Sequence, residues 1–479
     1  MPIALYTNTS FYNDIAEELR LFTNTAVLCA ETPALADVTV RLDGWTATAR
    51  ASLEVGEADY TYTHPAIEGS ALVIKRYQKR CVKIAAFRMM QRLYDVATPW
   101  GSLTGIRPTR LYRELLAEGR QAADDKMLNE FDVSPEKLRL AQTITAVQRP
   151  IFDTQTPKDV DVYIGVPYCR TRCLYCSFGS QVRDGKTDMR AYLAALKRDI
   201  AYGAAIVRDA GYALRSVYMG GGTPTVLTAA ELADVLGFAL DAYGGYGREF
   251  TVEAGRPDTI DEEKLRLLKR LGVGRISINP QSMNADTLAR IGRSHAPESI
   301  PTVFAISREM GFENINMDVI AGLPGENAED MRHTLEAIMR MGPDNLTVHT
   351  LAIKRSSRLK QCLEQYPLPD AATAVEMTRM GARAAETMGM RPYYMYRQKY
   401  MRGNLENVGY ALLGKECIYN VDMMEETTSI MAHGAGAMTK RIFGGAHRVE
   451  RIPNPKDVPT YIQKLELLEK QKRALFSQP

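Results

Sequence analysis

The sequence predicts an α/β protein built on a partial (β/α)6 barrel, with an N-terminal α+β domain and a mostly helical C-terminal region. Two observations lead to this fold class. Between Asp159 and about Thr350, short apolar runs alternate with longer helical patterns, which is typical of repeated βα units around a parallel sheet. The chain also has 479 residues, whereas one domain typically takes ~100 to 200 residues. We therefore expect a central catalytic domain with smaller domains on either side.

Six apolar runs are the expected strands of the barrel, and each is short enough for a strand. They cover residues 160–166, 216–219, 249–253, 275–279, 314–320 and 346–351. The stretches between them have helical periodicity, and each follows a polar turn or a turn with Gly or Pro. The clearest of these helices cover 189–210, 229–242, 261–271 and 328–341. In such a barrel, ligands bind at the carboxyl ends of the strands.

The flanking regions have different patterns. Residues 1–155 combine an acidic amphipathic start with alternating segments and later helical patterns, which indicates a separate α+β domain. Two prolines between Arg149 and Lys158 mark the expected linker. The barrel then occupies 156–368, and residues 369–479 form the third domain, which ends in an amphipathic helix over 458–476.

Composition narrows the class of protein. The chain is 45% hydrophobic and 24% charged, as in an ordinary globular protein, and its net charge is only +3. Such a balance gives no general attraction for nucleic acid, so we expect no nucleic-acid partner. No apolar stretch approaches the ~20 residues of a membrane span, and the first residues lack the pattern of a signal peptide. We expect a cytoplasmic protein that acts as a monomer.

Three of the seven cysteines lie within eight residues, directly after the first expected strand. Cys169, Cys173 and Cys176 have the spacing CxxxCxxC in the segment VDVYIGVPYCRTRCLYCSFGS. Three thiolates can bind three irons of a four-iron four-sulfur cubane and leave the fourth iron open. The amino and carboxylate groups of S-adenosylmethionine (SAM) can chelate that iron, and the cluster then cleaves SAM reductively. The spacing therefore indicates a [4Fe-4S] cluster and SAM in a reducing compartment.

Chance clustering of buried thiols and a zinc site are the alternatives to an iron-sulfur cluster, and both remain open at this point. Chance clustering is a weak alternative, because the three cysteines are so closely spaced. A zinc ion would need a fourth ligand, and the nearest downstream histidine is His295. Tyr168 and Tyr175 flank the cysteines and could shield a cluster from solvent.

Residues suited to a nucleoside or an amino acid recur at the ends of the later strands. A glycine run lets the backbone approach a ligand closely, and a polar side chain in an apolar strand is costly to bury without a partner. Each could instead be an ordinary turn, a satisfied core hydrogen bond or a surface cation. The candidates are Gly220, Gly221, Gly222, Thr223, Glu253, Gln281, Arg293, Asp318, the turn 322–325, His349, Ala352, Lys354 and Arg355.

With these motifs in hand, the chain resembles the oxygen-independent coproporphyrinogen III oxidase (dehydrogenase) family of the radical SAM superfamily. The resemblance rests on YIGVPYCRTRCLYC, GGGTPT, Glu253, QSMNADTLARIGRSH and NINMDVIAGLPGE, and it covers roughly residues 155 to 360. The stretches GIRPTRLY, YYMYRQKYMRGNLENVGYA and GAGAMTK look like the Z-type branch of that family. A partial radical SAM barrel is the fold that this resemblance implies.

The resemblance implies an activity and a set of contacts. A deoxyadenosyl radical removes hydrogen from a propionate side chain, carbon dioxide leaves and a vinyl group forms, twice per coproporphyrinogen III, to give protoporphyrinogen IX. A reduced flavodoxin- or ferredoxin-type protein would supply electrons, and one or two SAM molecules would bind. The residues matching the cluster-bound SAM site are Tyr163, Tyr175, Gly221 and Glu253. Those matching a second SAM site are Gly222, Thr223, Gln281, Arg293, Asp318 and Ala352.

One departure from the family pattern bears on function. Members with the dehydrogenase activity look like CxxxCxxCxC, whereas Phe178 stands at the position of the extra cysteine. The haem-chaperone branch of the family has phenylalanine there. Against that branch, Cys417, Tyr419 and Asn420 stand where it looks like Cys-Arg-His-Asn.

Three hypotheses follow from the sequence. The first is a coproporphyrinogen III dehydrogenase, the second a haem-binding delivery protein on the same scaffold, and the third a radical SAM enzyme acting on another tetrapyrrole. Each has a ligand with carboxylates, which would need cations in the site. The candidates for that role are Lys354, Arg355, Arg397 and Lys399.

Overall fold

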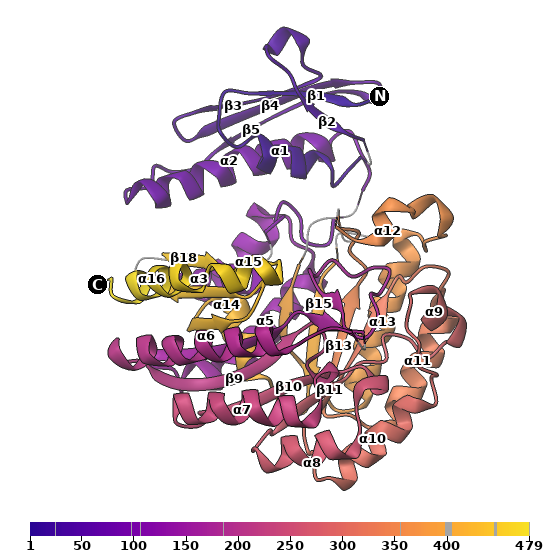
Figure 1. The fold of residues 1–479 in the computed structure, drawn as a ribbon. Coiled ribbons are helices and arrows are strands. Elements are labelled where there is room, and N and C mark those ends of the chain that lie inside the picture. Colours follow the sequence, from indigo (N-terminus) through magenta and orange to yellow (C-terminus); the bar gives the residue numbers. More distant parts are fainter. Residues whose placement is uncertain are drawn as a thin grey trace. The chain divides into compact units, whose positions relative to one another are not determined.

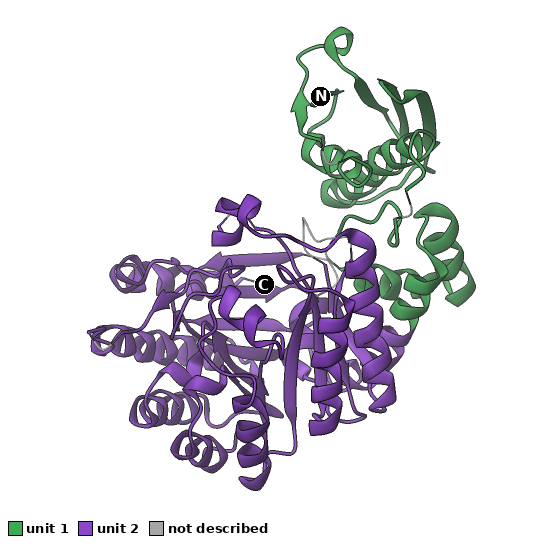
Figure 2. Ribbon diagram, turned by 90° about the vertical axis from the view of Figure 1, so that its right-hand side faces the viewer, with its two compact units in different colours: residues 1–142 green, residues 143–479 purple. Residues whose placement is uncertain are grey.

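The computed structural model describes residues 1–23, 25–96, 98–105, 107–184, 186–354, 356–397, 405–444 and 448–478. The chain divides into two compact units, unit 1 (residues 1–142) and unit 2 (residues 143–479), which Figure 2 shows in different colours. The sequence-based boundaries at residues 155 and 368 stay predictions. Within the described residues, no helix is long and apolar enough to cross a membrane.

Unit 1 contains a five-stranded sheet in the order β2-β1-β3-β4-β5. Its strands are β1 (Ile3–Thr7), β2 (Val27–Cys29), β3 (Val38–Asp43), β4 (Thr46–Leu53) and β5 (Gly56–Thr63). Helices α1 (Tyr12–Leu19) and α2 (Ala71–Gln91) pack on one face of this sheet (Figure 1). Helices α3 (Pro108–Leu115) and α4 (Arg120–Asp125) follow, and α5 (Pro135–Phe152) begins in unit 1 and ends in unit 2. Unit 1 therefore has the α+β composition that the sequence predicts for the N-terminal region.

Unit 2 is organised around an eleven-stranded sheet in the order β14-β15-β13-β12-β11-β10-β9-β6-β16-β17-β18. The six expected strands are all present, and neighbours in the sheet are parallel. They are β6 (Asp159–Val166), β9 (Ala213–Gly221), β10 (Glu249–Gly255), β11 (Arg275–Ile278), β12 (Ile315–Ala321) and β13 (Asn345–Thr350). The expected partial barrel is therefore confirmed.

Helices cover the outside of this sheet, as Figure 1 shows. The four expected helices correspond to α6 (Arg190–Asp209), α7 (Ala229–Tyr243), α8 (Glu262–Arg270) and α11 (Ala328–Met341). Two further helices, α9 (Ala285–Arg290) and α10 (Ser299–Glu309), lie between β11 and β12. Helix α7 begins with a capping box, in which Thr228 and Glu231 satisfy each other's backbone N–H groups.

The C-terminal region adds strands that the sequence analysis did not predict. Besides α13 (Ala371–Thr387), α14 (Ile418–Glu425), α15 (Val458–Gln463) and α16 (Leu465–Phe476), it contributes β14 (Arg391–Tyr396), β15 (Asn407–Ala411), β16 (Ser429–His433), β17 (Met438–Ile442) and β18 (Val449–Pro453). Strand β16 is parallel to β6, and β15 is antiparallel to β13. The expected single helix over 458–476 is two helices that meet at Lys464.

A buried ionic cluster attaches the C-terminal helix to this sheet. The carboxylate of Asp199 on α6 accepts hydrogen bonds from Lys472 Nζ (2.8 Å), His433 Nδ1 (2.9 Å) and Tyr461 Oη (2.7 Å). The side chains of Asp199, Lys472 and His433 are fully buried. Burial opposes ionisation of Asp199, but the Lys472 and His433 side chains outweigh it and lower the pKa of this carboxyl. Strand β16, which lies beside β6, is thereby fixed to α6 and α16.

Candidate cofactor site

The three clustered cysteines lie in a loop that leaves the carboxyl end of β6. The loop is closed by a short parallel pair, β7 (Tyr168–Cys169) with β8 (Gln181–Val182), and by a hydrogen bond of 2.8 Å from Arg183 N to Cys169 O. Cys169, Cys173 and Cys176 are free thiols and partly exposed. We call residues 167–183 the cysteine loop.

Contacts with distant segments fix the shape of the cysteine loop. Leu174, between two of the cysteines, is buried in an apolar cluster with Ile291, Leu359 and neighbouring residues. Its backbone N–H donates to Ile291 O, and its carbonyl accepts from Leu359 N, both at 2.9 Å. Thr171 Oγ1 donates to Gly292 O at 2.8 Å. The positions of the sulfurs are therefore set by residues more than a hundred positions later in the chain.

The glycine run after β9 packs directly against the cysteine loop. A Cβ atom at Gly222 would lie 2.4 Å from Tyr168 O and 2.9 Å from Cys169 Sγ. Only glycine avoids that clash, so this backbone reaches a cluster ligand because it has no side chain. Gly221 has φ of +112°, and a Cβ there would lie 3.4 Å from the hydroxyl of Tyr163. The next residue, Thr223, is buried, and its N–H donates to Tyr168 O at 2.8 Å.

Arg293 joins the cysteine loop to the strand-end residues. Its buried guanidinium lies near Tyr175 and Cys173, and its Nη1 donates to Asn279 O at 2.5 Å. Burial opposes the charge of Arg293, but Tyr175 and Cys173 raise its pKa overall. Among the described residues, its Nε has no hydrogen-bond partner. One cation therefore lies near both an expected cluster ligand, Cys173, and a tyrosine expected to bind SAM, Tyr175.

Gln281 has the features of a strained residue that is kept for a ligand. It is buried and has φ of +65°, in the left-handed region that costs a non-glycine residue about 1 kcal/mol or more. Its backbone exchanges hydrogen bonds with β12, from Gln281 N to Asp318 O at 2.9 Å and from Ile320 N to Gln281 O at 3.1 Å. Within the described part of the chain, its buried Oε1 has no hydrogen-bond partner. A buried acceptor of this kind is costly unless a ligand donates to it.

Glu253 on β10 and Asp318 on β12 lie near enough for the charge of Asp318 to act on Glu253. Glu253 Oε1 accepts from Tyr218 Oη at 2.5 Å, and burial together with the nearby charge of Asp318 raises the pKa of Glu253 to about 7. Asp318 accepts from Asn316 Nδ2 at 2.7 Å and lies 3.6 Å from His349 Nε2. These partners outweigh burial and lower the pKa of Asp318. The site therefore holds one carboxyl, Glu253, whose pKa is near neutral pH, and one, Asp318, that stays ionised.

Stacked tyrosines line the same interior. The ring of Tyr163 stacks on Tyr218 and Tyr419, with centroids 6.2 and 6.0 Å away, and Tyr218 stacks on Tyr419 at 4.5 Å. Tyr163 and Tyr218 are only half-buried. Aromatic surface beside the glycine run offers a flat apolar face to a ligand.

The candidates from the sequence divide into three groups by their placement. The first group lies in the cysteine loop or next to it. Its members are Cys169, Cys173, Cys176, Tyr163, Tyr175, Gly221, Gly222, Thr223 and Arg293. Glu253, Gln281 and Asp318 follow on the adjoining strands, whereas Ala352 is half-buried after β13 without a described side-chain contact. Among the cations, Lys354 is half-buried and Arg397 is buried, whereas Arg355 and Lys399 lie outside the described residues.

Two residues of the site escaped the sequence analysis. Tyr218 holds Glu253, and its inward position two residues before Gly220 is the signal that could have identified it. Arg256 is buried, donates to both oxygens of Asp258 at 2.9 Å, and donates to Thr171 Oγ1 at 2.5 Å. Its role in supporting the cysteine loop depends on the fold, because nothing near Arg256 in the sequence indicates that contact.

These residues fit a cubane cluster and a SAM molecule. The three thiols are close enough that Cys173 and Cys169 raise the pKa of Cys176, whose burial raises it further. Within the described residues, no three His, Cys, Asp or Glu side chains converge as ligands of one metal ion. A cubane takes one thiolate per iron, so its ligands need not converge in that way. The unpartnered Oε1 of Gln281 and the side-chain-free surface of Gly222 are features of a binding site.

Comparisons with known proteins identify the family of the chain. The family model of the radical SAM superfamily matches residues 163–338. The chain is 37% identical over 395 residues to the oxygen-independent coproporphyrinogen-III oxidase-like protein HemZ of Bacillus subtilis, a match that covers 81% of this chain and 79% of that protein. It is 30% identical over 236 residues to the heme chaperone HemW of the same organism, covering 48% of this chain and 61% of HemW.

Among solved structures, the coproporphyrinogen III oxidase HemN of Escherichia coli has a similar fold, with a TM-score of 0.52 and 21% identity. That match covers 68% of this chain and 73% of HemN. The fold and the cysteine loop place the protein in the radical SAM superfamily. Within that superfamily, the chain belongs to the oxygen-independent coproporphyrinogen-III oxidase-like family represented by HemZ. The family predicted from the sequence motifs is therefore confirmed.

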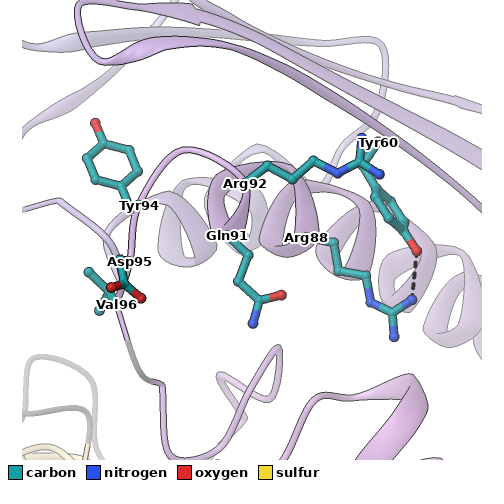
Figure 3. Close-up of a pocket in the computed structure, with 7 residues that line it drawn as sticks. All are labelled: Tyr60, Arg88, Gln91, Arg92, Tyr94, Asp95 and Val96. Atoms are coloured by element: carbon teal, nitrogen blue, oxygen red, sulfur yellow. Dashed lines mark hydrogen bonds between the residues drawn. The ribbon is translucent and has the colours of Figure 1, made fainter.

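Unit 1 has a shallow pocket of its own, with a volume of about 500 Å³. Figure 3 shows its lining, in which Arg88 of α2 and Arg92, the residue that follows α2, lie beside Tyr60. Arg88 Nη1 donates to Tyr60 Oη at 2.7 Å and its Nε to Asp132 Oδ2 at 3.0 Å, while Arg92 donates to Asp59 O at 2.5 Å. Both guanidinium groups are thus engaged in holding unit 1 together.

Proposed function

We propose that the protein is a radical SAM enzyme that converts coproporphyrinogen III to protoporphyrinogen IX by oxidative decarboxylation without oxygen. When bound, the cluster and SAM supply a deoxyadenosyl radical that takes a hydrogen atom from a substrate propionate. Carbon dioxide then leaves, one electron passes to an acceptor, and a vinyl group forms. The proposal rests on the radical SAM site and on the similarity to HemZ.

The observation that carries this proposal is the close approach of Gly222 to the cysteine loop, where a Cβ atom would lie 2.9 Å from Cys169 Sγ. It joins the loop that would bind the cluster to the residues that would bind SAM, so that both groups would lie in one site. In that site Cys169, Cys173 and Cys176 would hold three irons of the cluster. The residues for the cluster-bound SAM would be Tyr163, Tyr175, Gly221 and Glu253. Those for a second SAM would be Gly222, Thr223, Gln281, Arg293, Asp318 and Ala352.

Lys354 is our candidate for binding a substrate carboxylate. It follows β13 at the carboxyl edge of the sheet and is half-buried. Burial lowers the pKa of its ammonium group, and among the described residues it forms no ion pair. A half-buried cation without a carboxylate partner is costly, and a propionate of a tetrapyrrole would remove that cost. The tyrosines stacked on Tyr163 would face the apolar part of the macrocycle.

The test is an anaerobic assay of the iron-reconstituted protein with SAM, dithionite and coproporphyrinogen III. Mass spectrometry follows 5′-deoxyadenosine and porphyrin products together. We expect deoxyadenosine in proportion to the vinyl groups formed, and no product from Cys176→Ser, which lacks one cluster ligand. If the reconstituted protein cleaves SAM but forms no vinyl group, the substrate assignment is wrong.

Lys354→Met separates substrate binding from SAM cleavage. We expect it to raise the KM for coproporphyrinogen III about tenfold or more, and to leave SAM cleavage without substrate unchanged. Lys360→Met is the matched control, because Lys360 is exposed on the neighbouring helix α12 (Arg358–Gln361). Equal losses of both activities in Lys354→Met would refute the assignment of this residue.

Phe178 favours a second candidate function, that of a heme chaperone. It stands where the dehydrogenases carry an extra cysteine, and the chain is also similar to proteins named HemW. Under this alternative, the purified protein would bind haem in a fixed ratio and transfer it to an acceptor protein. An absorption spectrum without a haem band after incubation with haem would count against it.

A further inference from the structure

Arg172 is a cation of the cysteine loop to which the proposed function gives no role. It lies directly before Cys173, between the first two of the three cysteines. Its side chain is half-buried, and its Nη2 donates to the carbonyl oxygen of Ser356 at 3.2 Å. Its Nε is buried and has no hydrogen-bond partner among the described residues. The fold thus keeps a charged group beside the expected cluster ligands without satisfying all of its N–H groups.

The charge of Arg172 is not neutralised, in contrast to that of its neighbours in the loop. Arg170 lies 3.6 Å from a carboxylate oxygen of Asp258, and Arg183 binds Glu231 at 2.7 Å. No carboxylate pairs with Arg172 within the part of the chain that the structure describes. An arginine stays protonated at any pH at which the protein is folded, so this position holds a permanent positive charge.

A serine that follows β13 holds the Arg172 side chain near the third cysteine. The carbonyl of Ser356 accepts from Arg172, and the hydroxyl of the same serine donates to Ser177 O at 3.3 Å. Ser177 directly follows Cys176. Burial raises the pKa of the Cys176 thiol, and the positive charge of Arg172 opposes this rise. The guanidinium group therefore lies close enough to act on the sulfur of Cys176.

The segment that holds Arg172 is itself fixed to the cysteine loop. Leu359 is fully buried, and its N–H donates to Leu174 O at 2.9 Å. Ser357 caps the short helix α12 by accepting from Lys360 N. A buried N–H without an acceptor is costly, and a negatively charged group bound by the cysteines would remove that cost at Arg172 Nε. These contacts indicate that the position of Arg172 serves the group bound by the loop.

We propose that Arg172 raises the reduction potential of the cluster that the cysteine loop would hold, by keeping an unneutralised positive charge beside Cys176. The inference rests on the cluster of the proposed function. Reduction adds one electron from an external reductant to the iron atoms, and no bond forms or breaks in this step. Since three thiolates already make the oxidised cluster negative, a nearby cation favours the more negative reduced state. Arg172 would thereby favour the electron uptake that precedes SAM cleavage.

The experiment is a potentiometric titration of the iron-reconstituted full chain with dithionite, without SAM or a tetrapyrrole. Electron paramagnetic resonance measures the reduced cluster at each potential. We expect Arg172→Gln to shift the equilibrium about tenfold toward the oxidised cluster, which moves the midpoint of this one-electron couple about 59 mV to more negative potential. Arg172→Lys keeps the charge and should have a midpoint close to that of the unaltered protein.

Arg170→Gln is the matched control. Arg170 belongs to the same loop, but it is 58% exposed and has Asp258 as its partner, so water and that carboxylate screen its charge. This variant should leave the midpoint unchanged. If Arg172→Gln and Arg170→Gln have the same midpoint, the proposal is overturned. It is overturned as well if Arg172→Lys shifts the midpoint as far as Arg172→Gln does, because the charge would then not be the cause.

Two further readouts separate this inference from a structural role of Arg172 and from the proposed function. If Arg172 only shapes the loop, Arg172→Gln lowers the iron bound per chain and leaves the midpoint of the remaining clusters unchanged, which refutes the inference. The midpoint does not depend on how many chains hold a cluster, so partial loading leaves the comparison valid. A shifted midpoint in a protein that makes no porphyrin product supports the inference and refutes the proposed function.

Discussion

Replacing Glu253 by glutamine should make unit 2 more stable above neutral pH while it weakens SAM binding. The folded protein raises the pKa of Glu253 from an ordinary 4.5 to about 7, first through burial and then through the charge of Asp318. Tyr218 hydrogen-bonds to this carboxyl at 2.5 Å, and a glutamine amide oxygen can accept the same bond. The substitution therefore removes the cost of ionisation and keeps the local contact.

The magnitude depends on pH in a defined direction. Between pH 4.5 and about 7 the folded state binds more protons at Glu253 than the unfolded state does, so stability falls as pH rises through this range. One pKa unit corresponds to about 1.4 kcal/mol, so the ionised carboxylate costs at most about 3 kcal/mol near pH 8 and about 1 kcal/mol near pH 5. Glu253→Gln should recover that difference, which makes its stabilisation larger at the higher pH.

Urea unfolding followed by far-ultraviolet circular dichroism measures this effect. Tryptophan fluorescence would not, because Trp45 and Trp100 are the only two tryptophans of the chain and both lie in unit 1. The control is Glu313→Gln, because Glu313 is exposed and its replacement should change stability little at either pH. If the stabilisation by Glu253→Gln is the same near pH 5 and near pH 8, then the burial of Glu253 does not raise its pKa and the reasoning fails.

Two further substitutions test other parts of unit 2. Lys472→Met leaves the carboxylate of Asp199 buried without its lysine and should lower the free energy of urea unfolding by about 3 to 5 kcal/mol. The control is Lys470→Met, which should lower it by almost nothing because Lys470 is exposed. Equal losses would show that the buried ionic cluster does not support the sheet. Gly222→Ala places a Cβ against the backbone and a thiol of the cysteine loop and should lower the iron bound per chain after reconstitution. Gly237→Ala on helix α7, where a Cβ meets nothing within 4 Å, should leave iron content unchanged, so similar iron loss in both variants would contradict the close approach at Gly222.

Much of the site could be predicted because its chemistry is local in sequence. Cys169, Cys173 and Cys176 share one loop, and their spacing alone limits the groups that they can hold. The polar residues Glu253 and Asp318 stand out in apolar strands, where an unpartnered polar group is costly. The strands were equally visible, since buried parallel strands are short apolar runs bounded by turns.

Other parts of the site depend on segments that are far apart in sequence. Arg256 reaches Thr171 across 85 positions, and the stacking of Tyr419 on Tyr218 brings the C-terminal region into the barrel. Strands β14 to β18 were missed because they are short, and β14 to β17 owe their burial to neighbours from other parts of unit 2. Their tertiary contacts, rather than a strong local propensity, decide their conformation.

The sequence by itself determined the family and the partial barrel, because both depend on spacing along single strands, turns and loops, and the residues that would bind the cluster and SAM stay its prediction. Only the tertiary structure decided that Gly222 packs against Cys169, that Asp199 attaches α16 to the sheet, and that Phe178 faces solvent. The physical reason is that the packing of segments distant in sequence sets which side chains touch, which are buried and which face solvent. The pKa values of the side chains depend on that packing in turn.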